Sequence, residues 1–73
     1  MIDRSLAGRH CRTLRTVPHA RGPIQRDARG RIRYGMENIG RQLLLVDWED
    51  GGATLVFPAD VELLTAANAQ HRA

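Results

Sequence analysis

Large apolar side chains are concentrated in residues 40–64, and within this stretch residues 41–49 divide into two faces when counted with a period of two. Alternate residues of a β-strand point to opposite faces of a sheet, so residues 41–49 predict a strand. Its two faces carry Leu44, Val46 and Trp48 and, opposite them, Leu43, Leu45 and Asp47. We assign the first set to the core because this leaves Asp47 in water. Leu43 and Leu45 are then half-exposed apolar residues on the outer face.

A second strand returns along this one. Asp50, Gly51 and Gly52 tolerate positive φ angles and predict a tight hairpin turn. Residues 53–57 form the partner strand, with Leu55 and Phe57 assigned to the core. Residues 58–60 begin with proline and predict a corner of one 3₁₀ turn, and residues 61–64 form a short last strand.

The upstream half is less regular. Residues 11–17 mix β-branched residues with arginine and predict a first strand, which ends at Pro18 because proline has no amide hydrogen for the ladder. Two prolines and two glycines in residues 18–30 predict a long surface loop. Ile24 is its one large apolar residue, and we expect it to pin the loop to the core.

Residues 31–34 alternate arginine with apolar side chains and predict a half-buried strand with a basic outer face. In this strand Ile32 and Tyr34 face inward. Residues 35–40 begin and end with glycine and predict a connection, in which an edge of the sheet is covered by Met36 or Ile39.

The length of 73 residues allows one small domain. Residues 1–10 are poor in apolar bulk and predict a flexible basic arm, residues 11–64 hold the predicted strands, and residues 65–73 predict a frayed or disordered tail. There is no apolar core of a signal peptide, and the longest apolar run, residues 43–46, is far shorter than the ~20 residues of a membrane helix. We expect no contact with a membrane.

Cys11 is the only cysteine, so no internal disulfide forms. A lone thiol fits a reducing compartment and predicts a cytoplasmic location.

Charge is divided unevenly along the chain. Residues 1–41 hold ten arginines and three acidic residues, a formal charge of +7, and residues 42–73 hold one arginine and five acidic residues, a charge of −4. A basic half indicates an anionic partner, either nucleic acid or an acidic protein face. Two alternatives remain open: the halves neutralise each other on folding, or a GC-rich genome encodes arginine in place of lysine, which is absent here.

The predicted order of elements resembles an SH3-like small barrel. Residues 55–64 contain an aromatic–proline pair, a short turn and a final Val-x-x-hydrophobic strand. The spacing of Gly22 and Gly30 before Ile32 is similar to the turn and strand entry of KOW-type and photosynthetic-complex SH3-like barrels. The resemblance implies an all-β, five-stranded SH3-like barrel with a long basic loop after the first strand. The aromatic groove that binds polyproline in signalling SH3 domains is missing, because Tyr34, Trp48 and Phe57 are the only aromatic residues.

The sequence offers little material for catalysis or metal binding. His10, Cys11 and His19 match no established zinc spacing, and neighbouring strand residues such as His10 and Cys11 point to opposite faces. The acidic residues Asp47, Glu49 and Asp50 are typical of a solvated turn. We therefore expect no enzyme, no cofactor, no metal and no small-molecule substrate.

Two groups of residues remain as candidate binding sites. Leu43 and Leu45 predict a contact surface for a partner protein or a second copy, unless the arm covers them through Ile2 or Leu6. The basic set predicts an anion or nucleic-acid site and comprises Arg21, Arg26, Arg29, Arg31 and Arg33. The first group favours a non-catalytic protein-interaction module, and the second favours the alternative, a small barrel that binds RNA or DNA.

Overall fold

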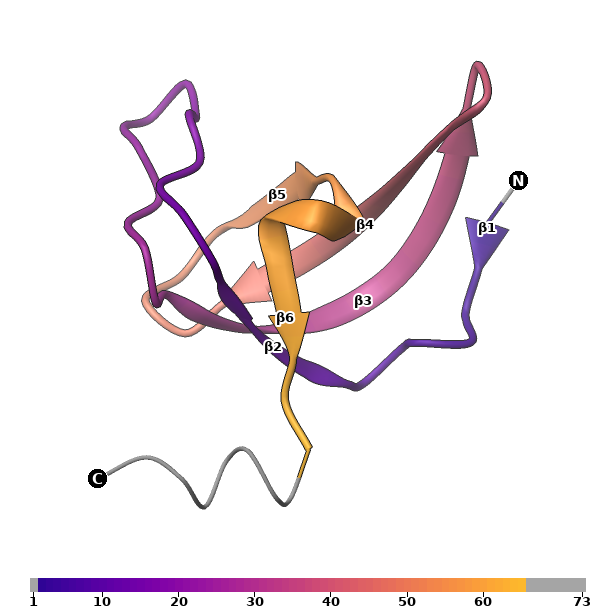
Figure 1. Ribbon diagram of the computed structural model, residues 1–73, viewed down its shortest axis with the longest axis horizontal. Coiled ribbons are helices and arrows are strands. Elements are labelled where there is room, and N and C mark those ends of the chain that lie inside the picture. Colours follow the sequence, from indigo (N-terminus) through magenta and orange to yellow (C-terminus); the bar gives the residue numbers. More distant parts are fainter. Residues whose placement is uncertain (1, 66–73) are drawn as a thin grey trace.

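The computed structural model describes residues 2–65, which form one antiparallel sheet (Figure 1). The strands are β1 (Ile2–Asp3), β2 (His10–Thr13), β3 (Arg29–Asn38), β4 (Arg41–Trp48), β5 (Ala53–Val56) and β6 (Val61–Leu63). Hydrogen-bonded neighbours follow the order β5-β4-β3-β2-β6, and β1 pairs with β3. The described chain is all-β, as the alternation predicts, with six strands in an open sheet.

The core lies on one face of the curled sheet. Its buried apolar side chains are those of Cys11, Val17, Ile32, Leu44, Val46, Trp48, Val56 and Val61. The set includes all three residues that alternation on residues 41–49 assigns to the core, so this assignment is confirmed. The 3₁₀ turn η1 (Pro58–Asp60) joins β5 to β6 and contacts β4, as the proline corner predicts.

The carboxylate of Asp60 holds η1 in place. Asp60 is buried, accepts the backbone N–H of Phe57 at 3.2 Å, and accepts Nε of Arg15 at 2.7 Å. A buried carboxylate needs such partners because an unpaired buried charge is strongly destabilising. The pair also ties the start of the loop after β2 to the turn that leads into β6.

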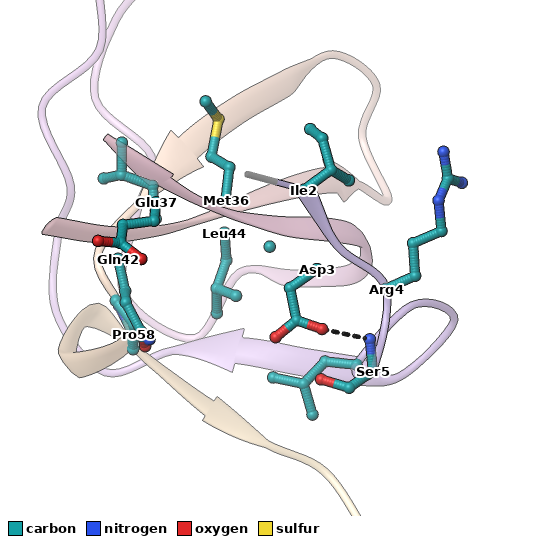
Figure 2. A pocket seen from close by; sticks show the side chains of 12 residues that line it. Ile2, Asp3, Arg4, Ser5, Met36, Glu37, Gln42, Leu44 and Pro58 are labelled. Atoms are coloured by element: carbon teal, nitrogen blue, oxygen red, sulfur yellow. Dashed lines mark hydrogen bonds between the residues drawn. The ribbon is translucent and has the colours of Figure 1, made fainter. Parts of the chain in front are cut away.

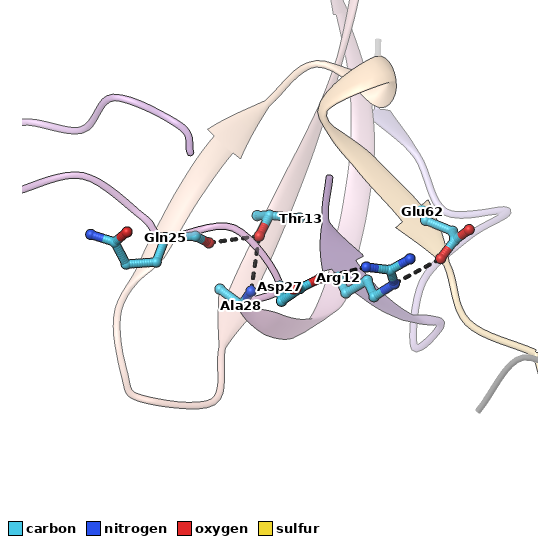
Figure 3. Close-up of polar contacts among 6 residues, drawn as sticks. All are labelled: Arg12, Thr13, Gln25, Asp27, Ala28 and Glu62. Carbon is cyan, nitrogen blue, oxygen red and sulfur yellow. Dashed lines mark hydrogen bonds and ion pairs between the residues drawn. The ribbon is translucent and has the colours of Figure 1, made fainter. Parts of the chain in front are cut away.

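The loop between β2 and β3 is fastened at both ends. Val17 and Ile24 form an isolated β-bridge, and Ile24 packs against the core, which confirms its predicted role as the pin of this loop. Thr13 is fully buried, and its hydroxyl donates to the carbonyl of Gln25 at 2.7 Å and accepts the N–H of Ala28 at 2.9 Å (Figure 3). The loop is therefore hydrogen-bonded to the end of β2.

Arg12 joins three segments on the other face of β2. Its guanidinium pairs with Asp27, at the end of the loop, and with Glu62 on β6 at 2.8 Å (Figure 3). Both carboxylates are partly exposed, and ion pairs of this kind contribute at most about 1 kcal/mol each. Arg12 is thus neutralised by its neighbours within the fold.

The hairpin of β3 and β4 is longer than predicted. The sequence predicts a strand over residues 31–34 and a connection over 35–40, but β3 continues to Asn38. The chain reverses in a tight turn at Ile39 and Gly40, with φ angles of 52° and 73°. Two successive positive φ angles suit a two-residue hairpin turn, which matches the right-handed twist of the strands. Ile39 is 94% exposed at the tip, so it does not cover an edge.

Tyr34 does not face the core, and its predicted orientation is wrong. The register of β3 against β4 shifts between Ile32 and Tyr34, so that Ile32 lies opposite Val46 and Tyr34 lies opposite Leu45. Such a β-bulge inserts an extra residue, here Arg33, and exchanges the faces of the residues beyond it. Tyr34 is therefore on the face away from the core.

The inward residue of β5 is also different from the prediction. Val56 is buried and pairs with Leu44, whereas Leu55 and Phe57 are 44% and 43% exposed. The two residues assigned to the core are thus on the surface. The reason is register: a strand repeats every two residues, and a change of one residue in the turn moves every side chain to the other face.

The predicted arm takes part in the sheet. Ile2 and Asp3 pair with Met36 and Gly35 of β3, and the N–H of Gly8 donates to the carbonyl of Ile32 at 2.8 Å. The segment runs beside β3 and continues into β2 (Figure 1). The sequence predicts strands only within residues 11–64. The pairing with β3 adds residues 2–3 to the sheet. The tail predicted for residues 65–73 lies, beyond residue 65, outside the described residues.

Gly30 allows β3 to pack closely against the part of β4 that carries Val46 and Trp48. A Cβ atom at position 30 would lie 2.6 Å from Cγ1 of Val46, 2.7 Å from the carbonyl oxygen of Asp47 and 2.9 Å from Cε3 of Trp48. Real Cβ atoms do not make contacts this short. At Gly35, further along the same strand, the nearest atom would be Cδ2 of Leu44 at 3.4 Å.

We expect Gly30→Ala to lower the free energy of unfolding by about 1–3 kcal/mol, because the added methyl group overpacks a site bounded partly by backbone. Gly35→Ala makes the same chemical change on the same strand and has room for the methyl group, so it should change stability by much less. Urea unfolding followed by Trp48 fluorescence measures both variants. Equal losses in the two variants would contradict the close approach at Gly30.

Candidate functional site

The face of the sheet opposite the core carries two rows of apolar side chains. Residues directly opposite each other in paired strands point to the same face. One row crosses β1, β3 and β4 at Ile2, Met36 and Leu43, and the next crosses β3, β4 and β5 at Tyr34, Leu45 and Leu55. We call these six residues the outer apolar band. In Figure 2 the side chains of Ile2 and Met36 point away from those of Leu44 and Asp3.

The band reaches the surface. Ile2 is 48% exposed and Leu55 is 44% exposed, and the other four residues are half-buried by their neighbours in the same rows. Leu43 and Leu45 are thus half-exposed and belong to a larger apolar surface than the sequence indicated. Tyr34 and Leu55 are missed because their faces depend on the bulge and on the β4–β5 register, and neither leaves a signal in the sequence.

The N-terminal segment does not lie over Leu43 and Leu45. Ile2 stands beside Met36 and so extends the row that contains Leu43. Leu6 packs against the core cluster, on the other face of the sheet. The sequence left open whether the arm covers Leu43 and Leu45 through Ile2 or Leu6. In the described residues, neither side chain lies over these leucines.

The five arginines of the basic set are divided between two places. Arg29 and Arg31 lie on β3. They are paired with Arg12 and His10 of β2, and this register places them on the outer face. Arg21 and Arg26 lie in the exposed loop between β2 and β3. The sequence places all five near one another, and the structure instead separates the loop pair from the strand residues.

Arg33 is neutralised by a carboxylate. Its guanidinium donates Nε to Oδ2 of Asp47 at 3.0 Å and a second N–H to Oδ1 of the same residue. This two-point contact lowers the pKa of Asp47 below its ordinary value, because hydrogen bonding and positive charge favour the carboxylate. Among residues 2–65, Arg29 and Arg31 have no such partner.

Arg21 lines a cleft of about 700 Å³ between the loop and the β4–β5 turn. Asp50 and Thr54 lie on the other side, and Trp48 forms part of the wall. The indole N–H of Trp48 is buried and finds no hydrogen-bond partner in the described residues. Arg26 does not line this cleft, so the two loop arginines do not form one anion site there.

A smaller cavity of about 330 Å³ opens on the core side of the sheet, beside Pro58 (Figure 2). Leu6 and Leu44 contribute apolar lining, and Asp3 and Glu37 contribute carboxylates. The oxygen Oδ1 of Asp3 accepts the N–H of Ser5 at 2.9 Å, which lowers the pKa of Asp3. The sequence could not indicate this cavity, because it forms only when β1 pairs with β3.

The residues with nucleophilic or metal-binding chemistry do not assemble. Cys11 is fully buried in the core, His10 is exposed on the neighbouring strand position, and Nδ1 of His19 accepts the N–H of Arg21 at 3.2 Å. In residues 2–65 there is no group of three or more metal-binding side chains. Burial raises the pKa of the Cys11 thiol to about 11, so the thiol stays protonated and unreactive at neutral pH.

The raised pKa of Cys11 makes stability depend on alkaline pH. The folded state holds the proton more tightly than the unfolded chain, whose thiol titrates near 9.0. The stabilisation is therefore complete below that pH and is lost as pH rises through about 11. Between pH 8 and pH 11, the free energy of unfolding should fall more steeply in the native protein than in Cys11→Ala. Parallel curves from urea unfolding would show that the thiol is not held protonated.

No protein-family model matches the sequence, and neither the curated proteins nor the solved structures contain a match. Within residues 2–65, none of the secondary structure is a helix with the length and hydrophobicity to cross a bilayer.

Proposed function

We propose that this chain is a non-catalytic protein-interaction module that docks on a partner protein, or on a second copy, through the outer apolar band. The observation that carries the proposal is the placement of six apolar side chains on the face away from the core, two of them nearly half exposed. Monomeric proteins rarely expose large contiguous apolar patches, and those that do generally use them to bind other molecules.

The scaffold of this module is, in our proposal, an SH3-like small barrel. The strand order β5-β4-β3-β2-β6 and the 3₁₀ turn between the last two strands agree with that architecture. The single thiol, buried and without a disulfide, supports a reducing compartment, and we place the module in the cytoplasm.

A nucleic-acid-binding barrel is the second candidate. It is favoured by Arg29 and Arg31, which lie side by side on the outer face without a carboxylate partner among the described residues. Single-strand binding also uses exposed aromatic side chains on which bases stack. The band offers only Tyr34 for this purpose, and its other members are aliphatic or methionine. We therefore rank it below protein binding.

Site-specific photo-crosslinking tests the proposed function. A benzophenone amino acid at position 55 lies in the band, and the same amino acid at position 16 lies in the loop between β2 and β3 and serves as the control. In native cell extract, position 55 should crosslink one discrete protein or a second copy of the chain, and position 16 should not. The product should be lost when Leu43→Gln and Leu45→Gln are combined, in a variant whose fold is verified by Trp48 fluorescence.

Equal crosslinking from positions 55 and 16 would contradict a binding role for the band. Crosslinks to nucleic acid alone, or a product that survives the double substitution, would contradict this role as well.

A further inference from the structure

Among residues 2–65, arginines without an ion-pair partner lie at both ends of the outer apolar band. Arg41 pairs with Asn38 at the hairpin end of the band, on the face of Leu43. Arg29 and Arg31 lie at the opposite end, on the face of Asp47. In residues 2–65 none of these three arginines has a carboxylate within ion-pair distance.

Two carboxylates on this face are engaged in ion pairs, whereas Glu49, whose N–H donates to the carbonyl of Arg29 at 2.9 Å, forms no ion pair within residues 2–65. Asp47 lies opposite Arg31 but is bound by Arg33, and Glu62 lies opposite Arg12 and is bound by it. The described strands therefore present an apolar surface with an arginine that forms no ion pair at each end, Arg41 at one and Arg31 at the other. Arg31 lies opposite position 47, which is six residue steps along β4 from Arg41, a length of roughly 20 Å.

This charge pattern disfavours a second copy as the occupant. In a two-fold symmetric dimer the same surface meets itself. Because Arg41 lies at one end of the band and Arg31 at the other, both without an ion pair among the described residues, either direction of stacking brings one of these arginines near another. Like charges placed opposite each other across an interface are costly, so the surface is better suited to a partner of opposite charge.

The pattern also disfavours nucleic acid as the occupant of the band. A polyanion would neutralise the arginines, but its charged backbone would lie against Leu43, Leu45 and Leu55, which gain nothing from contact with phosphate. Binding of a single strand needs π-faces for its bases, and Tyr34 is the only one present in the band. A partner that satisfies both parts of the surface needs apolar side chains between acidic ends.

The backbone of the partner is constrained as well. An extended segment laid across the face of a sheet leaves its own N–H and C=O groups without partners, whereas a helix satisfies them internally. A helix at 1.5 Å per residue covers a length of roughly 20 Å with about 13 residues. Helices commonly cover one face of a sheet in this way.

We propose that the outer apolar band receives an acidic amphipathic helix of a partner protein, with its apolar stripe on the band and carboxylates near each end facing Arg41 and Arg31. The inference rests on the proposed function and adds to it the chemistry and secondary structure of the partner. It predicts that affinity depends on the sign of the charges at both ends of the helix.

Two designed helical peptides test this inference on the full chain. Both have 16 residues and the same leucine stripe, and they differ only in carrying glutamates or lysines in their first and last turns. Fluorescence anisotropy should show that the glutamate peptide binds about tenfold or more tightly than the lysine peptide, with the difference shrinking as salt rises. Combining Arg31→Glu with Arg41→Glu should reverse the preference, and Arg26→Glu, in the loop, should leave it within about twofold.

Equal binding of the two peptides, or failure of the glutamate peptide to bind up to millimolar concentration, would overturn the acidic-helix inference. A single-stranded 12-mer oligonucleotide that displaces the glutamate peptide at equal concentration would also overturn it. The photo-crosslinking result is independent of these outcomes. If a partner is crosslinked but the two peptides bind equally, only the acidic-helix inference is refuted. If no partner is crosslinked and the glutamate peptide does not bind, the proposed function is refuted as well.

Discussion

The pairing of β3 with β4 is the interaction on which the remaining structure depends. It is the longest ladder of the sheet, and it determines which side chains enter the core and which form the outer apolar band. The bulge at Arg33 is the decisive point. Before it, Gly30 and Ile32 face the core, and beyond it the inward position passes to Gly35, while Tyr34 and Met36 face outward. A ladder without this bulge would place Tyr34 opposite Leu44 and would interrupt both the core and the band.

The same bulge connects the apolar surface to its charges. Arg33 occupies the extra position and reaches Asp47 on the neighbouring strand. This removes from the outer face the one carboxylate that lies opposite Arg31. The bulge that widens the apolar band thus also leaves Arg31 without an ion pair among the described residues.

Local patterns predicted the second half of the fold well. Alternation assigned Leu44, Val46 and Trp48 to the core, the glycines at 51 and 52 predicted the hairpin, and Pro58 predicted the 3₁₀ turn. In each case the responsible residues are adjacent in sequence, so the physical cause can be seen without the fold. Leu43 and Leu45 followed from the same alternation, and they are the part of the candidate site that the sequence indicated.

The remaining features depend on contacts between distant residues. Gly35 predicted a loop, but the long ladder with β4 keeps it in β3. Leu55 was assigned to the core because the register of β5 could not be derived from the turn residues alone. Which arginines form ion pairs depends on where Asp27, Asp47 and Glu62 lie in the folded chain. No single sequence pattern carries this information.

Adjacent leucines of β4 differ in their surroundings: Leu44 lies in the core, and Leu45 lies on the outer face that we propose binds a partner. Leu44→Ala and Leu45→Ala make the same chemical change one residue apart. Urea unfolding followed by Trp48 fluorescence should show a loss of about 2–4 kcal/mol for Leu44→Ala, because it empties space in the core. The loss for Leu45→Ala should be about 1 kcal/mol or less. Losses of equal size, or a larger loss at Leu45, would contradict the assignment of the two faces.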